Sequence, residues 1–215
     1  QSVFQTLHRD WQQDLESPIQ TIAEIFEGDA QALTNMWTEG GYSSAFNFPL
    51  HYALLETYCQ GAHPGRLAST FDITQQLRSS GWINFIDNHD VSRVASACDS
   101  QQKVEQALTA LLLAPGTPMV TYGTESGLTG VKEPENRADM VFDNTPLTAK
   151  IADVLAVRRH SPALYSGQRR SLDVSSEHWV DLRFSQTQSA AVIANFSRAS
   201  KSVTLPWTSG ALPLG

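Results

Sequence analysis

The chain has few cysteines and few basic residues, and it lacks any long apolar run. Cys59 and Cys98 are the only cysteines among 215 residues, which excludes a disulfide framework and a C-x-x-C metal pair but leaves room for one bridge. The sequence has 15 Lys and Arg and 22 Asp and Glu, which give a net charge of -7, and the basic residues form no block. We therefore expect no nucleic acid and no anionic membrane as partner, because both attract basic surfaces.

No segment approaches the roughly 20 apolar residues that a membrane-spanning helix needs. No charged and then apolar signal segment opens the chain either. The expectation is a protein without a membrane partner, whose localisation, secreted or cytoplasmic, stays open.

What the chain does contain is an alternation of short apolar runs with helical patterns over its first 160 residues. The predicted strands are residues 19–25, 42–48, 82–86 and 118–122, and the predicted helices are residues 1–14, 31–37, 49–60, 69–79, 99–112 and 146–159. Strands that alternate with helices predict an α/β fold with a parallel sheet and helical crossovers. Four such units are half of a TIM (β/α)8 barrel, so two sheet edges would stay open.

From Gln168 onward the apolar residues alternate with a period of two. Residues 178–184, 189–196 and 201–205 are predicted strands with no helix between them, which indicates a small antiparallel sheet. We predict two domains, the half-barrel over residues 1–163 and a β domain, complete or incomplete, over residues 164–215.

The segment FIDNHD, residues 85–90, places polar groups directly after a predicted strand. Asp87, Asn88, His89 and Asp90 bring two carboxylates, an amide and an imidazole together, a set that can grip polyhydroxylated ligands. Loops that leave the carboxyl ends of parallel strands commonly carry the chemistry of such folds. A polar turn, in which Asp and Asn bond their own backbone, explains the same residues equally well.

Glu24 lies at the end of the first predicted strand, among Ala23, Ile25 and Phe26. Apolar neighbours disfavour a charged carboxylate, which suits this residue to donate a proton to a leaving oxygen. Parallel strands would bring Glu24 to the same edge as Asp90, and paired carboxylates are what acetal hydrolysis uses. The alternative is a Glu that points outward and is merely solvated. For Glu125, after the last of these strands, capping the following loop is preferred over lining the edge.

These residues resemble motifs of the alpha-amylase family of glycoside hydrolases. FIDNHD is similar to that family's strand-seven motif, and IAEIFEGD, residues 22–29, to its strand-five motif. Residues 42–50 and 114–125 resemble its strand-six and strand-eight segments, in the same order. The resemblance implies that Glu24 is the acid/base, that Asp90 stabilises the transition state, and that His89 and Asn88 contact the sugar.

The family's nucleophile motif, Gly-Phe/Leu-Arg-x-Asp at the end of strand four, has no counterpart here, since Val-Asp-Leu-Arg-Phe at residues 180–184 has the wrong order. The resemblance implies the C-terminal half of a retaining enzyme acting on alpha-glucans or related oligosaccharides. We expect it to need its N-terminal barrel half and, alone, to be inactive. The alternatives are one half of a split enzyme or a non-catalytic module that binds sugar or self-associates. No cofactor or metal ligand set is predicted, although calcium is possible in a complete enzyme of this family.

Overall fold

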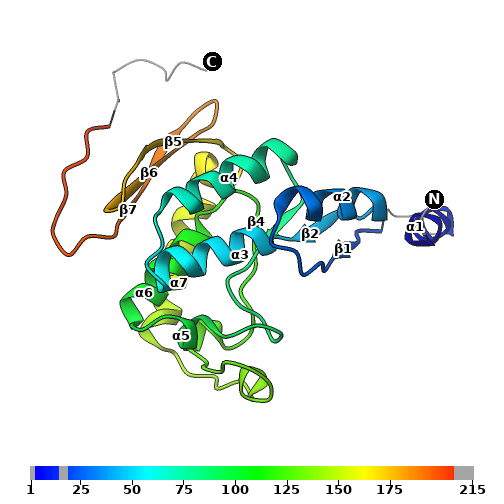
Figure 1. Ribbon diagram of the computed structural model, residues 1–215, viewed down its shortest axis with the longest axis horizontal. Coiled ribbons are helices and arrows are strands. Elements are labelled where there is room, and N and C mark those ends of the chain that lie inside the picture. The colour runs from blue at the N-terminus through cyan, green and yellow to red at the C-terminus, as the bar shows by residue number, and fades with distance from the viewer. Residues whose placement is uncertain (1–2, 15–18, 206–215) are drawn as a thin grey trace.

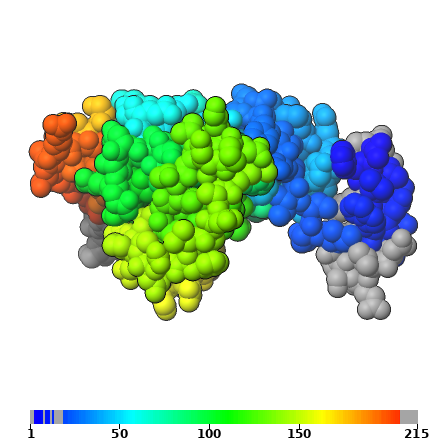
Figure 2. Space-filling view, turned by 90° about the horizontal axis from the view of Figure 1, so that it is seen from below, coloured from blue at the N-terminus to red at the C-terminus, as the bar shows by residue number. Residues whose placement is uncertain are grey.

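The computed structural model describes residues 3–14 and 19–205. Its first helix, α1 (Val3–Asp14), lies at one end of the molecule, where Phe4 packs on Tyr42 with ring centroids 5.7 Å apart (Figure 1). The helix predicted over residues 1–14 is confirmed over this range, whereas residues 1–2 fall outside the described residues. Figure 2 shows the same helix in dark blue at one end of the molecule. The apolar side chains of this helix, Val3, Phe4, Leu7 and Trp11, are exposed.

A parallel sheet lies at the centre of the fold. Its strands are β1 (Ile22–Ala23), β2 (Ser44–Phe46), β3 (Trp82–Asn84) and β4 (Thr117–Pro118), and they neighbour one another in sequence order. Every pair is parallel, with Ala23 opposite Ala45 and Ala45 opposite Trp82. The predicted α/β class and parallel pairing are confirmed.

The strands are shorter than the sequence predicts, and the last one is misplaced. The prediction of residues 118–122 is wrong, since β4 is Thr117–Pro118 and the chain then leaves the sheet. Thr121 donates its hydroxyl to the Asp87 carbonyl at 2.9 Å, and the amide of Thr124 donates to the Thr121 carbonyl. These turn contacts replace the ladder that a longer strand would need.

Helices connect the strands and cover the sheet (Figure 1). Their bounds are α2 (Ala30–Gly40), α3 (Phe48–Leu54) continued by the π-helix η1 (Leu55–Cys59), α4 (Gly65–Leu77), α5 (Val94–Ala97), α6 (Gln101–Leu112), α7 (Pro146–Arg159) and α8 (Pro162–Tyr165), with 3-10 turns η2 (Thr124–Ser126) and η3 (Glu135–Arg137). The helix predicted over residues 99–112 begins later than predicted, because its N-cap is Ser100, whose side chain accepts from the Lys103 amide. Asp99 instead accepts from Lys103 Nζ at 2.8 Å.

The second sheet is antiparallel and consists of β5 (Gln168–Val174), β6 (His178–Phe184) and β7 (Ser189–Asn195) in that order. Residues 201–205 form no strand, so that prediction is wrong. Asn195 and Ser197 close a turn by donating to the Ala199 carbonyl, and this turn diverts the chain from the sheet. The domain division at 163/164 stays a prediction.

Two apolar cores hold these layers. One core lies around β1–β3 and α2 and includes Trp37, Phe48 and Phe85. The other packs α3, α4, α6 and α7 together and also receives Trp179 from β6. Trp179 stacks on Phe71 of α4 with ring centroids 5.6 Å apart, which seats the antiparallel sheet on the helices.

A disulfide joins Cys59 at the end of η1 to Cys98 between α5 and α6, with Cα atoms 4.3 Å apart. The bridge that the sequence left open is therefore formed. Cys98 is also buried, as expected for a small residue in this position.

Candidate active site

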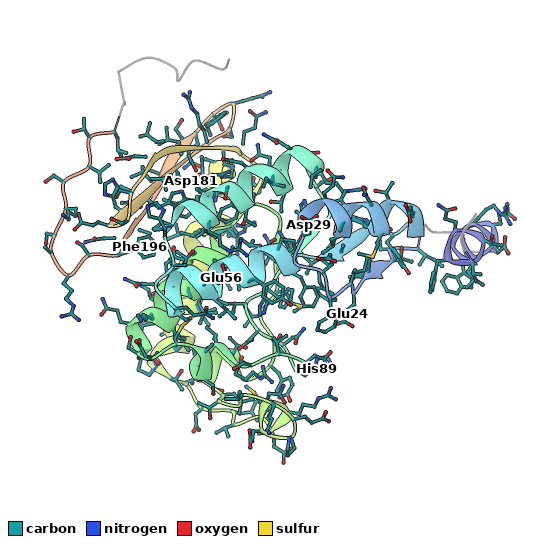
Figure 3. All side chains as sticks on the ribbon, in the orientation of Figure 1. Glu24, Asp29, Glu56, His89, Asp181 and Phe196 are labelled. Atoms are coloured by element: carbon teal, nitrogen blue, oxygen red, sulfur yellow. A yellow bond between two sulfur atoms is a disulfide. The ribbon has the colours of Figure 1, made fainter. Side chains whose placement is uncertain are left out.

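The two segments singled out in the sequence leave the same edge of the parallel sheet. Glu24 directly follows β1, and residues 85–90 directly follow β3, whose strand runs in the same direction. Figure 3 shows the labelled Glu24 and His89 on the same side of the sheet. The carboxyl edge of a parallel sheet is where side chains from separate strands can act on one ligand.

Glu24 is exposed, while its direct neighbours Ala23 and Ile25 are buried and half-buried. Ile22 is 53% exposed and Phe26 is 56% exposed, so the described residues do not enclose the Glu24 carboxyl group. Its role as an acid stays a prediction.

Asp87 points inward and holds the loop together. Its Oδ2 accepts from the Val94 amide at 2.9 Å, and its Oδ1 accepts from the Thr124 hydroxyl at 2.6 Å. Burial raises the pKa of the Asp87 carboxyl, while these hydrogen bonds and the nearby Arg93 oppose that rise. Both oxygens of the Asp87 carboxylate thus accept hydrogen bonds from the protein's own groups.

Asn88 is also buried, and its Oδ1 accepts from the backbone amides of Asp90 at 2.8 Å and Val91 at 3.1 Å. The polar-turn interpretation therefore describes Asn88 well. Contact between Asn88 and a sugar stays a prediction.

His89 and Asp90 are the members of the segment that reach solvent, with side chains 49% and 27% exposed. His89 Nε2 lies 3.4 Å from Asp90 Oδ2. The other carboxylate oxygen, Asp90 Oδ1, accepts from Arg137 Nη2 at 2.6 Å. Exposed at the edge of the sheet, this pair offers a carboxylate oxygen and an imidazole to a polyhydroxylated ligand.

Asn136 and Arg137 were not identified from the sequence. Asn136 Nδ2 donates to the carbonyls of His89 and Val91, and Arg137 Nε donates to the His89 carbonyl. They are 45 to 48 residues away along the chain, and an Asn-Arg pair in a loop has no pattern that identifies such a role.

His51 contacts the first two residues of the segment 85–90. Its Nδ1 lies 2.8 Å from the Ile86 carbonyl, and its ring stacks on Phe85 at 4.9 Å. Because the carbonyl only accepts, Nδ1 carries the proton. Burial lowers the pKa of His51 to about 4, partly offset by the bond to Ile86. His51 therefore has a structural role, since its imidazole binds a backbone carbonyl and packs on an aromatic ring.

Glu125 contacts the start of the helix that follows it. Its backbone carbonyl accepts from the hydroxyls of Thr145 at 3.1 Å and Thr148 at 2.9 Å, at the start of α7. Its side-chain Oε2 is buried without a hydrogen-bond partner among the described residues. These contacts are made by the Glu125 backbone, so the choice for its side chain between capping the following loop and lining the edge stays a prediction.

Within residues 3–14 and 19–205, no group of three or more His, Cys, Asp or Glu side chains could hold a metal ion. No described helix is long and apolar enough to cross a membrane. The expectations about cofactors and calcium stay predictions.

Sequence comparison with known proteins identifies relatives of this chain. Residues 3–197 match the sequence profile of the family described as alpha amylase, catalytic domain. A cyclomaltodextrin glucanotransferase of Niallia circulans is 33% identical over 136 residues, which are 62% of this chain and 19% of that protein. An alpha-amylase of the same organism is 30% identical over 136 residues, with 62% and 25% covered.

Among solved structures, the alpha-amylase from Geobacillus thermoleovorans complexed with acarbose superimposes with a TM-score of 0.81 at 21% identity. The match covers 90% of this chain and 45% of that one, which shows a shared fold over part of a barrel and the following sheet. The chain thus spans at most a quarter of these two curated relatives and less than half of this solved structure. Because the family profile covers nearly all of its residues, the chain belongs to the alpha-amylase family of glycoside hydrolases.

Proposed function

We propose that this chain carries part of the active site of a retaining alpha-glycosidase or transglycosidase that acts on alpha-glucans or related oligosaccharides. The observation that carries the proposal is that Glu24 and the His89–Asp90 pair leave one edge of one parallel sheet. Relatives named as glucanotransferase and alpha-amylase support the substrate class.

In this proposal Glu24 is the general acid. As the glycosidic bond breaks, its carboxyl proton passes to the leaving oxygen, while a nucleophilic carboxylate elsewhere in the protein bonds the anomeric carbon. Glu24, now a carboxylate, then takes a proton from the incoming water or sugar hydroxyl, whose oxygen displaces the nucleophile. The acceptor decides whether the outcome is hydrolysis or glycosyl transfer.

Asp90 stays ionised and stabilises the oxocarbenium-like transition state by its negative charge. His89 donates a hydrogen bond to a hydroxyl of the same sugar. Both side chains are exposed at the edge of the sheet, where a ligand could reach them.

The chain has no Gly-Phe/Leu-Arg-x-Asp motif to supply the nucleophile. Turnover in this proposal therefore requires the other half of the barrel, on the same polypeptide or on a separate one. The 215-residue chain alone should show no detectable hydrolysis of maltooligosaccharides, and robust turnover by it would refute the requirement.

The test of the acid is Glu24→Gln in the full-length protein that contains this chain. We expect the kcat for maltoheptaose to fall about 10²- to 10⁴-fold, the usual contribution of a general acid. Alpha-maltosyl fluoride has a leaving group that needs no proton, so the first-turnover burst of fluoride release should be affected far less, whereas the later turnovers still need Glu24 as the base.

Glu27→Gln is the matched control, because Glu27 lies in the same loop and binds the Asp29 amide through its side chain. It should leave both activities close to the parent's. If Glu24→Gln also leaves maltoheptaose turnover unchanged, Glu24 is not the acid.

The second candidate is an association module, favoured by the exposed apolar residues of α1 and β1, among them Phe4 and Ile22. Such a surface fits a second barrel half or another copy of the chain. Size-exclusion chromatography with light scattering distinguishes this candidate, because a stable dimer of the isolated chain would support it.

A further inference from the structure

The short turn η3 holds residues 89–91, which include Asp90, through hydrogen bonds. Asn136 Nδ2 donates to the carbonyls of His89 at 2.9 Å and Val91 at 3.1 Å. Arg137 adds two contacts, from Nε to the His89 carbonyl at 3.2 Å and from Nη2 to Asp90 Oδ1 at 2.6 Å. Four hydrogen bonds from two consecutive residues thus hold three consecutive residues.

The turn itself is fixed by a buried side chain. Arg93 is fully buried, and its Nε donates to the Asn136 carbonyl at 2.8 Å while its Nη1 donates to the Tyr122 carbonyl at 3.0 Å. Its backbone amide donates to the Gly130 carbonyl. The loop approaches so closely that a Cβ on Gly130 would lie 2.4 Å from the Asn136 nitrogen. Because both ends of the loop are anchored, η3 presents Arg137 in a defined position.

The planar guanidinium of arginine binds two acceptors in a fixed relative geometry. Arg137 uses this geometry on one carbonyl and one carboxylate oxygen of adjacent residues, which sets the rotation of the Asp90 carboxylate. Asp90 Oδ2 is left near His89 Nε2, at 3.4 Å.

We propose that Arg137 is a positioning residue for Asp90, orienting its carboxylate for the transition state. The inference rests on the proposed function of Asp90. An exposed ion pair by itself contributes little to stability, and the Arg137 side chain is 43% exposed. The Arg137 guanidinium therefore acts mainly by fixing the orientation of the Asp90 carboxylate. Its removal should lower kcat more than it lowers the stability of the fold.

The test is Arg137→Ala in the full-length protein, with kcat and KM measured on maltoheptaose. Since a misplacement of about 1 Å can cost up to about 100-fold in rate, we expect kcat to fall about 10- to 100-fold. KM should change less than threefold, and the thermal midpoint should stay within a few degrees of the parent's.

Arg137→Lys should restore part of kcat, because it keeps the charge but not the planar fork. Lys132→Ala is the control, since Lys132 is an exposed cation of the same loop, and it should leave kcat unchanged. If Arg137→Ala unfolds the protein, Arg137→Lys carries the test, with an expected kcat below the parent's.

The outcomes separate this inference from the proposed function. If Asp90→Asn keeps the parent's kcat, the proposed role of Asp90 is wrong, and the inference is overturned with it. If Asp90→Asn abolishes turnover while Arg137→Ala keeps full kcat, or changes KM alone, only the positioning role is refuted. If Arg137→Ala and Lys132→Ala lower kcat equally, general loss of positive charge replaces positioning as the cause.

Discussion

Replacing His51 should flatten the acid side of the protein's stability profile. His51 is buried, its Nδ1 donates to the Ile86 carbonyl, and its pKa is lowered from 6.5 to about 4 by burial. Between these two values the unfolded chain binds a proton that the folded chain does not. Stability that is present at neutral pH is therefore lost as the pH falls through 6.5 toward 4.

The size of this loss follows from the two pKa values. The protonated fractions of His51 in the folded and unfolded states give the change in the free energy of unfolding. Lowering the pH from 7 to 5 reduces that free energy by about 2 kcal/mol through His51. Carboxyl groups titrate over part of the same range, so the informative quantity is the difference between the parent and a variant without the imidazole.

The assay is urea unfolding of the full-length protein, followed by tryptophan fluorescence at pH 7 and pH 5. His51→Gln keeps a donor for the Ile86 carbonyl but cannot titrate, so its unfolding free energy should fall by about 2 kcal/mol less than the parent's over this interval. Tyr52→Phe is the control, because it keeps the buried imidazole and its ring contact at 5.0 Å, and its pH dependence should match the parent's. Equal pH dependence in the parent and His51→Gln would refute the buried neutral imidazole.

Two stability predictions come from other parts of the fold. Asp181 is fully buried between Arg169 and Arg183, so Asp181→Asn leaves two buried cations underpaired and should destabilise by about 3 to 5 kcal/mol in chemical denaturation. The same change at Asp173, which is 53% exposed beside His178, should cost under about 1 kcal/mol, and equal losses would contradict the reasoning. Replacing both Cys59 and Cys98 by Ala opens a loop with a sequence separation of 39 and should cost about 3 to 4 kcal/mol, a loss that a reducing agent should reproduce in the parent.

The alternation of apolar runs and helical patterns predicted the parallel sheet, because strand and helix periods are local properties of the sequence. Helix α7 was predicted at its observed bounds, since Pro146 at its start and the apolar residues at helical spacing mark it directly. The strand lengths of the parallel sheet were not predictable, because a ladder persists only where a neighbour lies in register, and β1 keeps only Ile22 and Ala23.

The residues at the carboxyl edge of the parallel sheet were likewise predictable only in part. The sequence by itself determined that Glu24 and residues 85–90 follow strands of one parallel sheet, since strand direction follows from the alternation. Only the tertiary structure decided that Asp87 and Asn88 turn inward while His89 and Asp90 stay exposed, because hydrogen bonds from Val94, Thr124 and the local backbone make that choice. It also brought Arg137 to Asp90 across 47 residues, a contact with no periodic trace in the sequence, because it depends on a loop anchored by the buried Arg93.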